Sequence, residues 1–258
     1  MIKVNGVLIE QDKFGDGTLK CKEPELGKYP YSTKTILWCY DNDAELFTII
    51  SLVEFFRNQY PRAAIELKLP YIPHARQDRR VSGRLFTLRA FAKLINALGF
   101  CSVRVLDPHS DVSCALFDRL DCSYSVFDTE YGGAAVLYPD AGAAKKYSSI
   151  EGVPNPIIGN KHRNEEGRID GYELVNFKEG TKKVAIRDDI CSYGGTFVAA
   201  AKELRKRGVE EIVLFVSHCE NNILKGEVFD YVDRVFTTDS IFTGSHPQIT
   251  IVKSFRGE

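Results

Sequence analysis

Apolar residues along the chain recur in two patterns, short continuous runs and helical spacings, which alternate through most of its length. Three helices are predicted from apolar residues at helical spacing: one that ends before Pro61, one that ends at Gly99, and one that runs from Phe197 to Gly208. Alternating strands and helices indicate an α/β fold with mainly parallel sheets. The short apolar runs predict buried strands at Thr35–Tyr40, Ala64–Leu69, Ser102–Leu106, Val184–Ile186 and Ile212–Val216.

Several shorter segments complete this prediction. Asp16-Gly17 predicts a hairpin turn within Phe14–Lys20. The polar, aperiodic stretch Asn164–Gly171 is typical of a mobile loop. Past Cys122 the strand pattern restarts, which divides the chain into residues 1–124 and 125–258. Further extended pieces are expected at Ser125–Phe127, Ala134–Leu137, Pro156–Ile158 and Val235–Phe236, with Gln248–Phe255 returning as an edge strand.

Composition narrows the class of protein. The 258 residues are 44% hydrophobic and 27% charged, which is ordinary for a globular protein, and the net charge of −1 leaves no basic domain for nucleic acid. Seven cysteines without a CxxC pair indicate reduced thiols rather than a zinc site or a disulfide framework. The N-terminus lacks signal-peptide regions and no apolar run approaches membrane-spanning length, so we expect a cytoplasmic protein with no membrane partner.

The strongest chemical motif is the stretch VAIRDDICSYGGT, residues 184–196. Gly194, Gly195 and Thr196 precede a helix, and backbone N–H groups at such a turn can hold a phosphate. Asp188 and Asp189 beside it suit sugar hydroxyls or a divalent cation. The alternative is an ordinary strand-to-helix turn, in which Asp and Gly are common.

Other polar clusters follow predicted strands, where open α/β sheets bind their ligands. The segment PYIPHARQDRR carries Arg76, Gln77, Asp78 and Arg79, whose donors suit a polyphosphate and an adenine edge, although a solvated loop would look the same. His109 lies within Asp107–Asp111 and favours a ligand or metal role. Asp140 ends another strand. A cluster of Lys161, His162 and Arg163 is either a solvated surface or part of a loop that closes over an anion.

Taken together, these segments resemble the ribose-phosphate pyrophosphokinases, also called phosphoribosyl pyrophosphate synthetases. FGDGTLK, PYIPHARQDRR, DPHSD, YPDAG, NKHR, RDDICSYGGT and TTDSI occur in the family's order between Phe14 and Ile241. The resemblance implies two phosphoribosyltransferase-like halves, each a mainly parallel sheet flanked by helices. It makes residues 1–124 the ATP-binding half and residues 125–258 the ribose-phosphate-binding half, with the active site between them.

The resemblance also implies a role for each matched residue. In the first half, Arg76, Gln77, Asp78, Arg79 and His109 would bind ATP, while Phe14 and Asp16 would reach the nucleotide of a neighbouring subunit in a homo-oligomer, a dimer or larger. In the second half, Lys161 and Arg163 would be the catalytic cations, and His109 with Asp140 would hold Mg²⁺, with Asp107 behind His109. The ribose phosphate would lie against Asp140, Asp188, Asp189, Ser192, Tyr193, Gly194, Gly195 and Thr196.

The chain departs from the family where the sugar phosphate would bind. The family's loop reads DDxxDTGGT, and here Ser192 and Tyr193 replace its third Asp and its first Thr. Thr18 stands where an adenine-binding Glu is expected, and Lys145-Lys146 replace a more apolar run.

Three alternatives to ribose 5-phosphate pyrophosphorylation therefore stay open. A ribose whose 5-phosphate is esterified, such as ADP-ribose, could be the acceptor, with Tyr193 and Arg187 suited to it. The chain could also be a phosphoribosyltransferase, or an inactive regulatory partner subunit.

Overall fold

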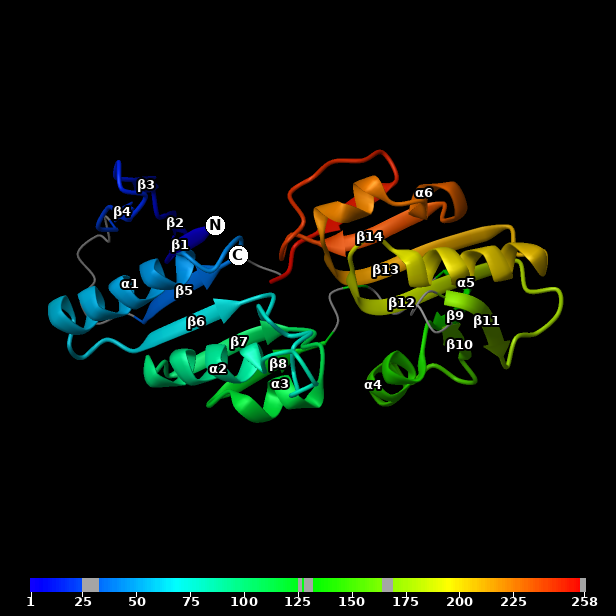
Figure 1. Cartoon of the computed structure of the whole chain (residues 1–258), viewed down its shortest axis with the longest axis horizontal. Helices are drawn as coiled ribbons and strands as arrows, with labels where there is room; N and C mark the ends of the chain where they lie inside the picture. The colour runs from blue at the N-terminus through cyan, green and yellow to red at the C-terminus, as the bar shows by residue number, and fades with distance from the viewer. Residues whose placement is uncertain (25–32, 125–126, 128–131, 164–168, 256–258) are drawn as a thin grey trace. The chain divides into compact units, whose positions relative to one another are not determined.

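A computed structural model describes the chain except residues 25–32, 125–126, 128–131, 164–168 and 256–258. The described residues form two compact units, one within Met1–Tyr124 together with Phe255, and one within Ser125–Ser254. In Figure 1 the first unit is coloured from blue at β1 to green at α3, and the second from green at β9 and α4 to orange at β14.

The first unit contains a six-stranded sheet in the order β2-β1-β5-β6-β7-β8, in which β5 to β8 are parallel. A separate two-stranded hairpin confirms the turn predicted at Asp16-Gly17. The strands are β1 (Ile2–Val4), β2 (Val7–Leu8), β3 (Gln11–Lys13), β4 (Leu19–Cys21), β5 (Lys34–Trp38), β6 (Ile65–Leu69), β7 (Ser102–Leu106) and β8 (Leu120–Ser123), and the helices are α1 (Glu45–Gln59), α2 (Thr87–Ala97) and α3 (Asp111–Leu116).

The core of the first unit follows from the apolar spacings in the sequence. Ile49, Leu52 and Phe56 of α1, together with Leu88 and Ile95 of α2, are buried in one cluster. Alternate residues of β5, β6 and β7 enter the same cluster, because side chains of a strand point to opposite faces in turn. The helices predicted to end before Pro61 and at Gly99 are both confirmed.

The second unit contains a seven-stranded sheet in the order β11-β10-β9-β12-β13-β14-β15, parallel except for the β10–β11 pair. The last strand lies at the edge, as predicted for the C-terminal stretch. The strands are β9 (Ala135–Tyr138), β10 (Ile157–Arg163), β11 (Ile169–Val175), β12 (Lys183–Cys191), β13 (Glu211–Cys219), β14 (Arg234–Thr238) and β15 (Ile249–Val252); the helices are α4 (Ala141–Glu151), α5 (Gly195–Lys206), the 3-10 turn η1 (Asn221–Lys225) and α6 (Val228–Tyr231).

Helices cover both faces of this second sheet. Val184 and Ile186 pack in the cluster that contains Phe197 and Leu204 of α5, whereas Ala185 between them packs with Tyr147 of α4. The alternation along β12 therefore assigns α5 to one face and α4 to the other. Both units have the predicted fold class, a mainly parallel sheet flanked by helices.

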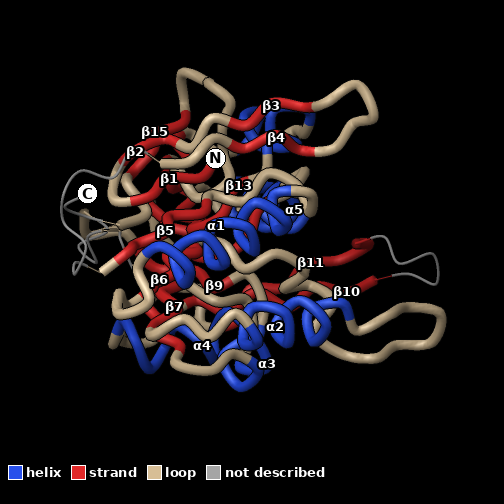
Figure 2. The backbone as a smooth tube through the Cα atoms, turned by 90° about the vertical axis from the view of Figure 1, so that its left-hand side faces the viewer, coloured by secondary structure: helices blue, strands red, loops and turns tan. Residues whose placement is uncertain are grey.

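Three sequence predictions need correction. The strand predicted at Val184–Ile186 continues to Cys191, so both acids lie on the strand in register with β13 and not in a turn. Lys161 and Arg163 lie on β10. Of the loop predicted at Asn164–Gly171, residues 164–168 lie outside the described part of the chain, and β11 begins at Ile169. Figure 2 shows β10 and β11 side by side. Helix α4 was not predicted, because small and polar residues dominate it.

Three further sequence predictions concern an extended piece, the cysteines and membrane-spanning segments. Of the extended piece predicted at Ser125–Phe127, residues 125 and 126 lie outside the described part of the chain. The seven cysteines are all free thiols, and Cys191 and Cys219 are buried. No helix in the described residues is both long enough and apolar enough to cross a bilayer.

Candidate functional site

Charged residues gather where parallel strands of the second unit end. Asp140 lies two residues after β9 and caps α4, since its Oδ1 accepts a hydrogen bond from the Ala143 N–H at 3.0 Å. Lys161 on the neighbouring strand β10 places its Nζ 2.8 Å from Asp140 Oδ2. Asp188 and Asp189 lie on β12, the neighbour of β9 on its other side. The predicted residues Asp140, Lys161, Asp188 and Asp189 thus come from three adjacent strands at one edge of the sheet.

The Tyr172 side chain fixes the β10–β11 pair against this edge. The Tyr172 hydroxyl donates to the Pro139 carbonyl at 2.9 Å, and the ring passes over Gly159, where a Cβ would collide with it. Burial raises the pKa of Tyr172 well above its usual range, so the hydroxyl keeps the proton it donates. A glycine on β10 therefore allows the contact that holds Lys161 beside Asp140.

The acids of the site have opposite pKa shifts. Burial acts to raise the pKa of Asp140, but hydrogen bonds from Lys161 and Ala143 outweigh it, so this pKa is lowered. Burial and the charge of Asp189 raise the pKa of Asp188 well above its ordinary value. Asp188 Oδ1 accepts the Asp189 N–H at 2.9 Å. The site holds one acid that ionises readily and one whose ionisation is costly.

Lys146 is a member of this cluster that the sequence analysis did not assign to the site. Its Nζ lies 3.4 Å from Asp189 Oδ2, and both side chains are largely buried. Asp140 is a residue type that commonly caps helix N-termini, and this could have predicted a helix from residue 141. Such a helix carries Lys146 on its second turn, next to Tyr147.

The glycine loop of the motif leads directly into α5. Gly194 adopts φ 81° as the N-cap, and Gly195 and Thr196 form the first helical turn. Ser192 Oγ donates to Glu220 Oε2 at 2.5 Å, so its hydroxyl is held by a residue that follows β13. The Tyr193 side chain is 56% exposed. Glu220 was missed, although the parallel register of β12 and β13 places the residues after both strands together.

Arg187 contradicts the sequence prediction made for it. From the sequence, Arg187 was expected to contact an esterified acceptor. Its side chain is instead 0% exposed, and its Nε donates to Glu151 Oε1 at 3.0 Å. It points to the α4 face of the sheet, as Ala185 does two residues earlier. Arg187 is therefore not available to contact an acceptor.

Arg163 is the remaining predicted cation of this unit. Its backbone pairs with Ile169 at the end of β10, two residues beyond Lys161. A register shift between His162 and Arg163 interrupts the β10–β11 pairing just before this residue.

In the first unit, two predicted segments follow neighbouring parallel strands. The segment with Arg76, Gln77, Asp78 and Arg79 follows β6 and precedes α2, while His109 follows β7. Asp78 is buried and accepts from Arg79 Nε at 3.1 Å, whereas the other three are exposed. Both segments lie at the carboxyl edge of the sheet, where ligands bind in open α/β folds.

Asp107 has an unusual backbone conformation beside His109. It is fully buried and has φ 45°, a region that a non-glycine residue adopts only under constraint from its surroundings. Its N–H donates to the Ser123 carbonyl at 2.6 Å. His109, two residues later, is partly exposed.

Phe14 and Asp16 lie at the tip of the β3–β4 hairpin. Asp16 Oδ1 accepts from both the N–H and the hydroxyl of Thr18, at 3.0 and 2.7 Å, which closes the turn and lowers the pKa of Asp16. Phe14 is 54% exposed. Thr18, noted as a departure from the family, is committed to this turn.

The charged groups suit a magnesium ion bound together with substrate phosphates. Among the residues that the structure describes, no three His, Cys, Asp or Glu side chains gather as a metal site. Mg²⁺ is usually held by one or two carboxylates and the substrate's phosphate oxygens rather than by a protein cage. Asp140 offers a carboxylate of this kind.

Comparison with known proteins finds relatives over most of the chain. Ribose-phosphate pyrophosphokinase from Marinomonas sp. (strain MWYL1) is 27% identical over 249 residues, which cover 89% of this chain and 77% of that protein. The protein of the same name from Sulfolobus acidocaldarius is 25% identical and covers 95% of this chain and 86% of its own length. No family model matches the chain.

A solved structure has the same fold. Phosphoribosylpyrophosphate synthetase from Mycobacterium smegmatis superposes with a TM-score of 0.74 at 21% sequence identity, covering 95% of this chain and 86% of that one. The resemblance to the ribose-phosphate pyrophosphokinase family that the sequence motifs predict is thus confirmed.

Proposed function

We propose that this chain, a relative of the ribose-phosphate pyrophosphokinases, transfers the β,γ-diphosphoryl group of ATP to the 1-hydroxyl of ribose 5-phosphate. The products would be phosphoribosyl pyrophosphate and AMP. The observation that carries the proposal is the charge pair at the second sheet's edge: Lys161 Nζ lies 2.8 Å from Asp140 Oδ2, next to the paired acids Asp188 and Asp189.

The second unit has groups for each part of the acceptor. Carboxylates of Asp188 and Asp189 would accept hydrogen bonds from the ribose hydroxyls. Backbone N–H groups from Gly194 to Thr196, at the start of the 12-residue helix α5, would hold the 5-phosphate. Tyr193 would border the same phosphate.

The transfer itself needs alignment and neutralised charge rather than a nucleophilic side chain. The oxygen of the 1-hydroxyl forms a bond to the β-phosphorus and its proton is released to solvent. The bond from that phosphorus to the oxygen that bridges it to the α-phosphorus breaks, and AMP leaves with this oxygen. Lys161 and Arg163 would stabilise the charge on the transferring group. Mg²⁺ would neutralise phosphate charge when bound, and Asp140 of the second unit supplies a carboxylate of the kind that holds it.

The first unit would bind the nucleotide. Arg76 and Arg79 are cations suited to phosphate oxygens, and Gln77 and Asp78 can pair with the donors and acceptors of a nucleoside. Phe14 and Asp16 would contact the nucleotide held by a neighbouring subunit of a homo-oligomer.

The test is to incubate the purified protein with ATP, MgCl₂ and ribose 5-phosphate and to follow AMP release and the phosphorus NMR spectrum of the sugar product. We expect AMP in equal amount to a new diphosphate on carbon 1. Absence of AMP both with ribose 5-phosphate and with ADP-ribose would point to an inactive partner subunit. Consumption of phosphoribosyl pyrophosphate without ATP would point instead to a phosphoribosyltransferase.

A second candidate acceptor is a ribose whose 5-phosphate is esterified, such as ADP-ribose. The exposed ring of Tyr193 favours it, because an aromatic side chain at the phosphate can stack on the esterifying group, whereas a free monoester requires donors on all sides. Ser192 cannot supply such a donor while its hydroxyl is bonded to Glu220. Running the same assay with both acceptors decides between them by the ratio of kcat/KM.

A further inference from the structure

The side chain of Arg187 connects four elements of the second unit without reaching its surface. On β12, its Nε donates to Glu151 Oε1 at 3.0 Å at the end of α4, and its Nη1 donates to Ser217 Oγ on β13 at 3.3 Å. Glu151 Oε2 in turn accepts from the Tyr138 hydroxyl on β9 at 3.2 Å. Hydrogen bonds from a single buried ion pair thus connect β9, β12, β13 and α4.

Aromatic rings enclose the same guanidinium. Its Cζ lies 4.2 Å from the centroid of the Tyr147 ring and 5.3 Å from that of Phe127, and Tyr138 stacks on Tyr147 with centroids 5.9 Å apart. A planar guanidinium matches both a carboxylate and a ring face, which an ammonium does not. The position of α4 on the sheet is therefore determined at Tyr147 and at Glu151, four residues apart on one helical face.

The elements held in this way carry the charged groups of the proposed site. Asp188 and Asp189 follow Arg187 immediately on β12. Helix α4 begins after Asp140 and carries Lys146 next to Tyr147, with Lys146 Nζ 3.4 Å from Asp189 Oδ2. A shift of α4 along the sheet would change this distance and the position of Asp140 together.

We propose that Arg187 and Glu151 are positioning residues, which set the placement of α4 so that Asp140, Lys146 and Asp189 present one acceptor site. The proposal rests on the proposed function, because it assigns the acceptor to these acids. It predicts that the ion pair determines acceptor affinity and leaves ATP affinity unchanged.

Stability alone is a poor explanation for this pair. Replacing both members of a buried ion pair by apolar residues of similar volume is often neutral or stabilising, whereas removing one member leaves an unpaired buried charge. A double substitution, Arg187→Met with Glu151→Leu, therefore separates positioning from folding better than either single change.

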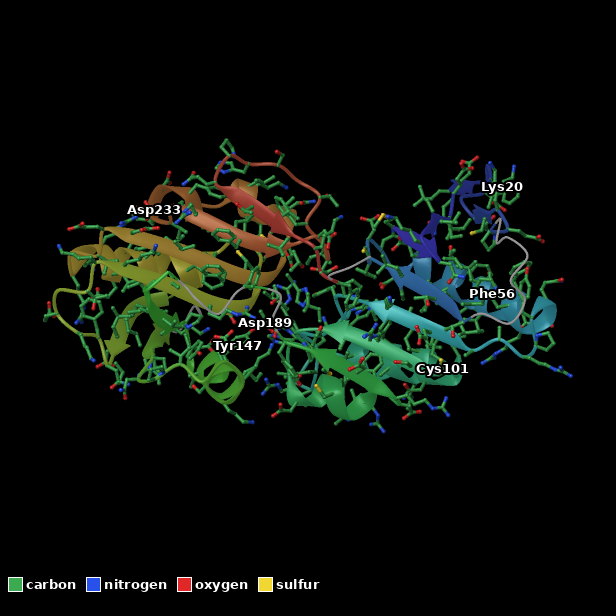
Figure 3. The ribbon with its side chains drawn as sticks, turned by 180° about the vertical axis from the view of Figure 1, so that it is seen from behind. Lys20, Phe56, Cys101, Tyr147, Asp189 and Asp233 are labelled. Atoms are coloured by element: carbon green, nitrogen blue, oxygen red, sulfur yellow. The ribbon has the colours of Figure 1, made fainter. Side chains whose placement is uncertain are left out.

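The matched control removes an ion pair from the same unit at the other end of the strands. Arg205 Nη2 lies 2.8 Å from Asp233 Oδ2, and Asp233 precedes β14. Figure 3 shows Asp189 and Tyr147 near each other in this unit and Asp233 apart from both. The control is Arg205→Met with Asp233→Leu.

The experiment measures thermal unfolding and the kinetics of AMP release for both double variants and the wild type. For Arg187→Met/Glu151→Leu we expect an unfolding midpoint within about 4 °C of the wild type and a KM for the acceptor raised about tenfold or more, with KM for ATP unchanged. The control should keep both KM values. An acceptor KM within twofold of wild type in a folded Arg187→Met/Glu151→Leu variant would overturn the proposal.

Two further measurements keep the outcome decisive. If the double variant does not fold, Arg187→Lys retains the charge but loses the planar contact, and an unchanged acceptor KM in that variant would equally overturn the proposal. If the wild type releases no AMP with either acceptor, the proposed function fails. Amide exchange of Ala141–Glu151, expected to be faster than in the control, then still tests whether the pair fixes α4.

Discussion

At the residue scale, the contact between Lys161 and Asp140 has the clearest expected consequence. Losing a cation that stabilises transferring charge commonly lowers turnover by on the order of 100- to 1000-fold. We expect Lys161→Ala to lower kcat by this factor with little change in ATP binding, since the nucleotide is assigned to the first unit. Steady-state AMP release and calorimetric titration with ATP measure the two effects.

The control for this variant is Lys182→Ala. Lys182 pairs with Glu210 on the exposed surface at the start of β12 and β13, at 2.6 Å. Removing an exposed pair changes stability by about 1 kcal/mol or less. Equal turnover in the two variants would remove Lys161 from the mechanism.

We expect the ionised Asp188 carboxylate to lower the stability of the fold while it contributes to acceptor binding. Its pKa is raised in the folded protein by burial and by Asp189, so the fold loses stability as the pH rises from the ordinary carboxyl pKa through the folded one. Asp188→Asn should therefore raise the unfolding midpoint at pH 7 more than at pH 4, while acceptor KM increases. An Asn Oδ1 can still accept the Asp189 N–H.

Asp239→Asn supplies a control of opposite sign. Burial acts to raise the pKa of Asp239, but hydrogen bonds from Ser254 and Lys253 outweigh it and lower the pKa. Its contribution to stability is present above the unfolded pKa and is lost as the pH falls. This variant should lose stability at pH 7 and little at low pH. A difference in midpoint between Asp188→Asn and the wild type that is the same at pH 4 and pH 7 would contradict the assigned shift.

Residue chemistry was easier to predict from the sequence than residue environment. The sequence identified Asp140, Asp188 and Asp189 because carboxylates near the ends of predicted strands suit ligands of open α/β sheets, and the family resemblance added Lys161. It could not show that Arg187 is buried, because the strand was predicted to end at Ile186. Side chains alternate between the two faces of a strand, so the face on which an arginine lies follows only when the ends of the strand are known.

At the element scale, the glycine loop is shaped by the segment that follows β13. A Cβ on Gly194 would collide with Val228 Cγ2, and one on Gly226 would collide with the Tyr193 carbonyl. Together with the Ser192–Glu220 hydrogen bond, these contacts fix the start of α5 against η1 and α6. Ser192 and Tyr193, which depart from the family's loop sequence, are thus in contact with the segment from Glu220 to Val228.

Gly194→Ala tests this packing. The substitution forces φ 81° on an alanine, which costs about 1–2 kcal/mol, and adds a collision that costs about 1–3 kcal/mol. Gly208→Ala is the matched control, because Gly208 has the same φ and open space around it. We expect Gly194→Ala to be the less stable of the two by chemical denaturation and to weaken acceptor binding. Equal losses would mean that the collision is relieved without cost.

The order of the elements and the ends of the apolar helices followed from the sequence, while the extent of strands β12 and β11 did not. Helices α1, α2 and α5 have strong apolar faces and were predicted with their stop signals. Strand β12 extends beyond its apolar run because β13 continues to pair with it through Asp188 and Cys191. Strand β11 lies at the edge of the sheet and pairs with β10 alone. Its strand conformation depends on this pairing and not on an apolar pattern that the sequence would show.

At the scale of the whole molecule, the hairpin tip predicts a shared active site. Phe14 is more than half exposed and its only described ring contact is with Lys20, whose Nζ lies 5.6 Å from the ring centroid. A single exposed aromatic side chain is common on proteins and indicates little by itself. The prediction that Phe14 contacts the nucleotide of a neighbouring subunit rests on the resemblance of its motif to the family.

Mixing two inactive variants tests this sharing directly. Phe14→Ala would impair the site of the neighbour, whereas Lys161→Ala impairs the site of its own chain. In a mixed dimer, one of the two sites would have both Phe14 and Lys161 intact. An equal mixture of exchanging subunits makes about half of the dimers mixed, so about a quarter of wild-type turnover should be recovered. If each chain instead uses its own Phe14, the mixture can show only the mean of the two variants, since no combination restores a site. The rate of AMP release before and after exchange, with size-exclusion chromatography to verify that mixed oligomers form, distinguishes these outcomes.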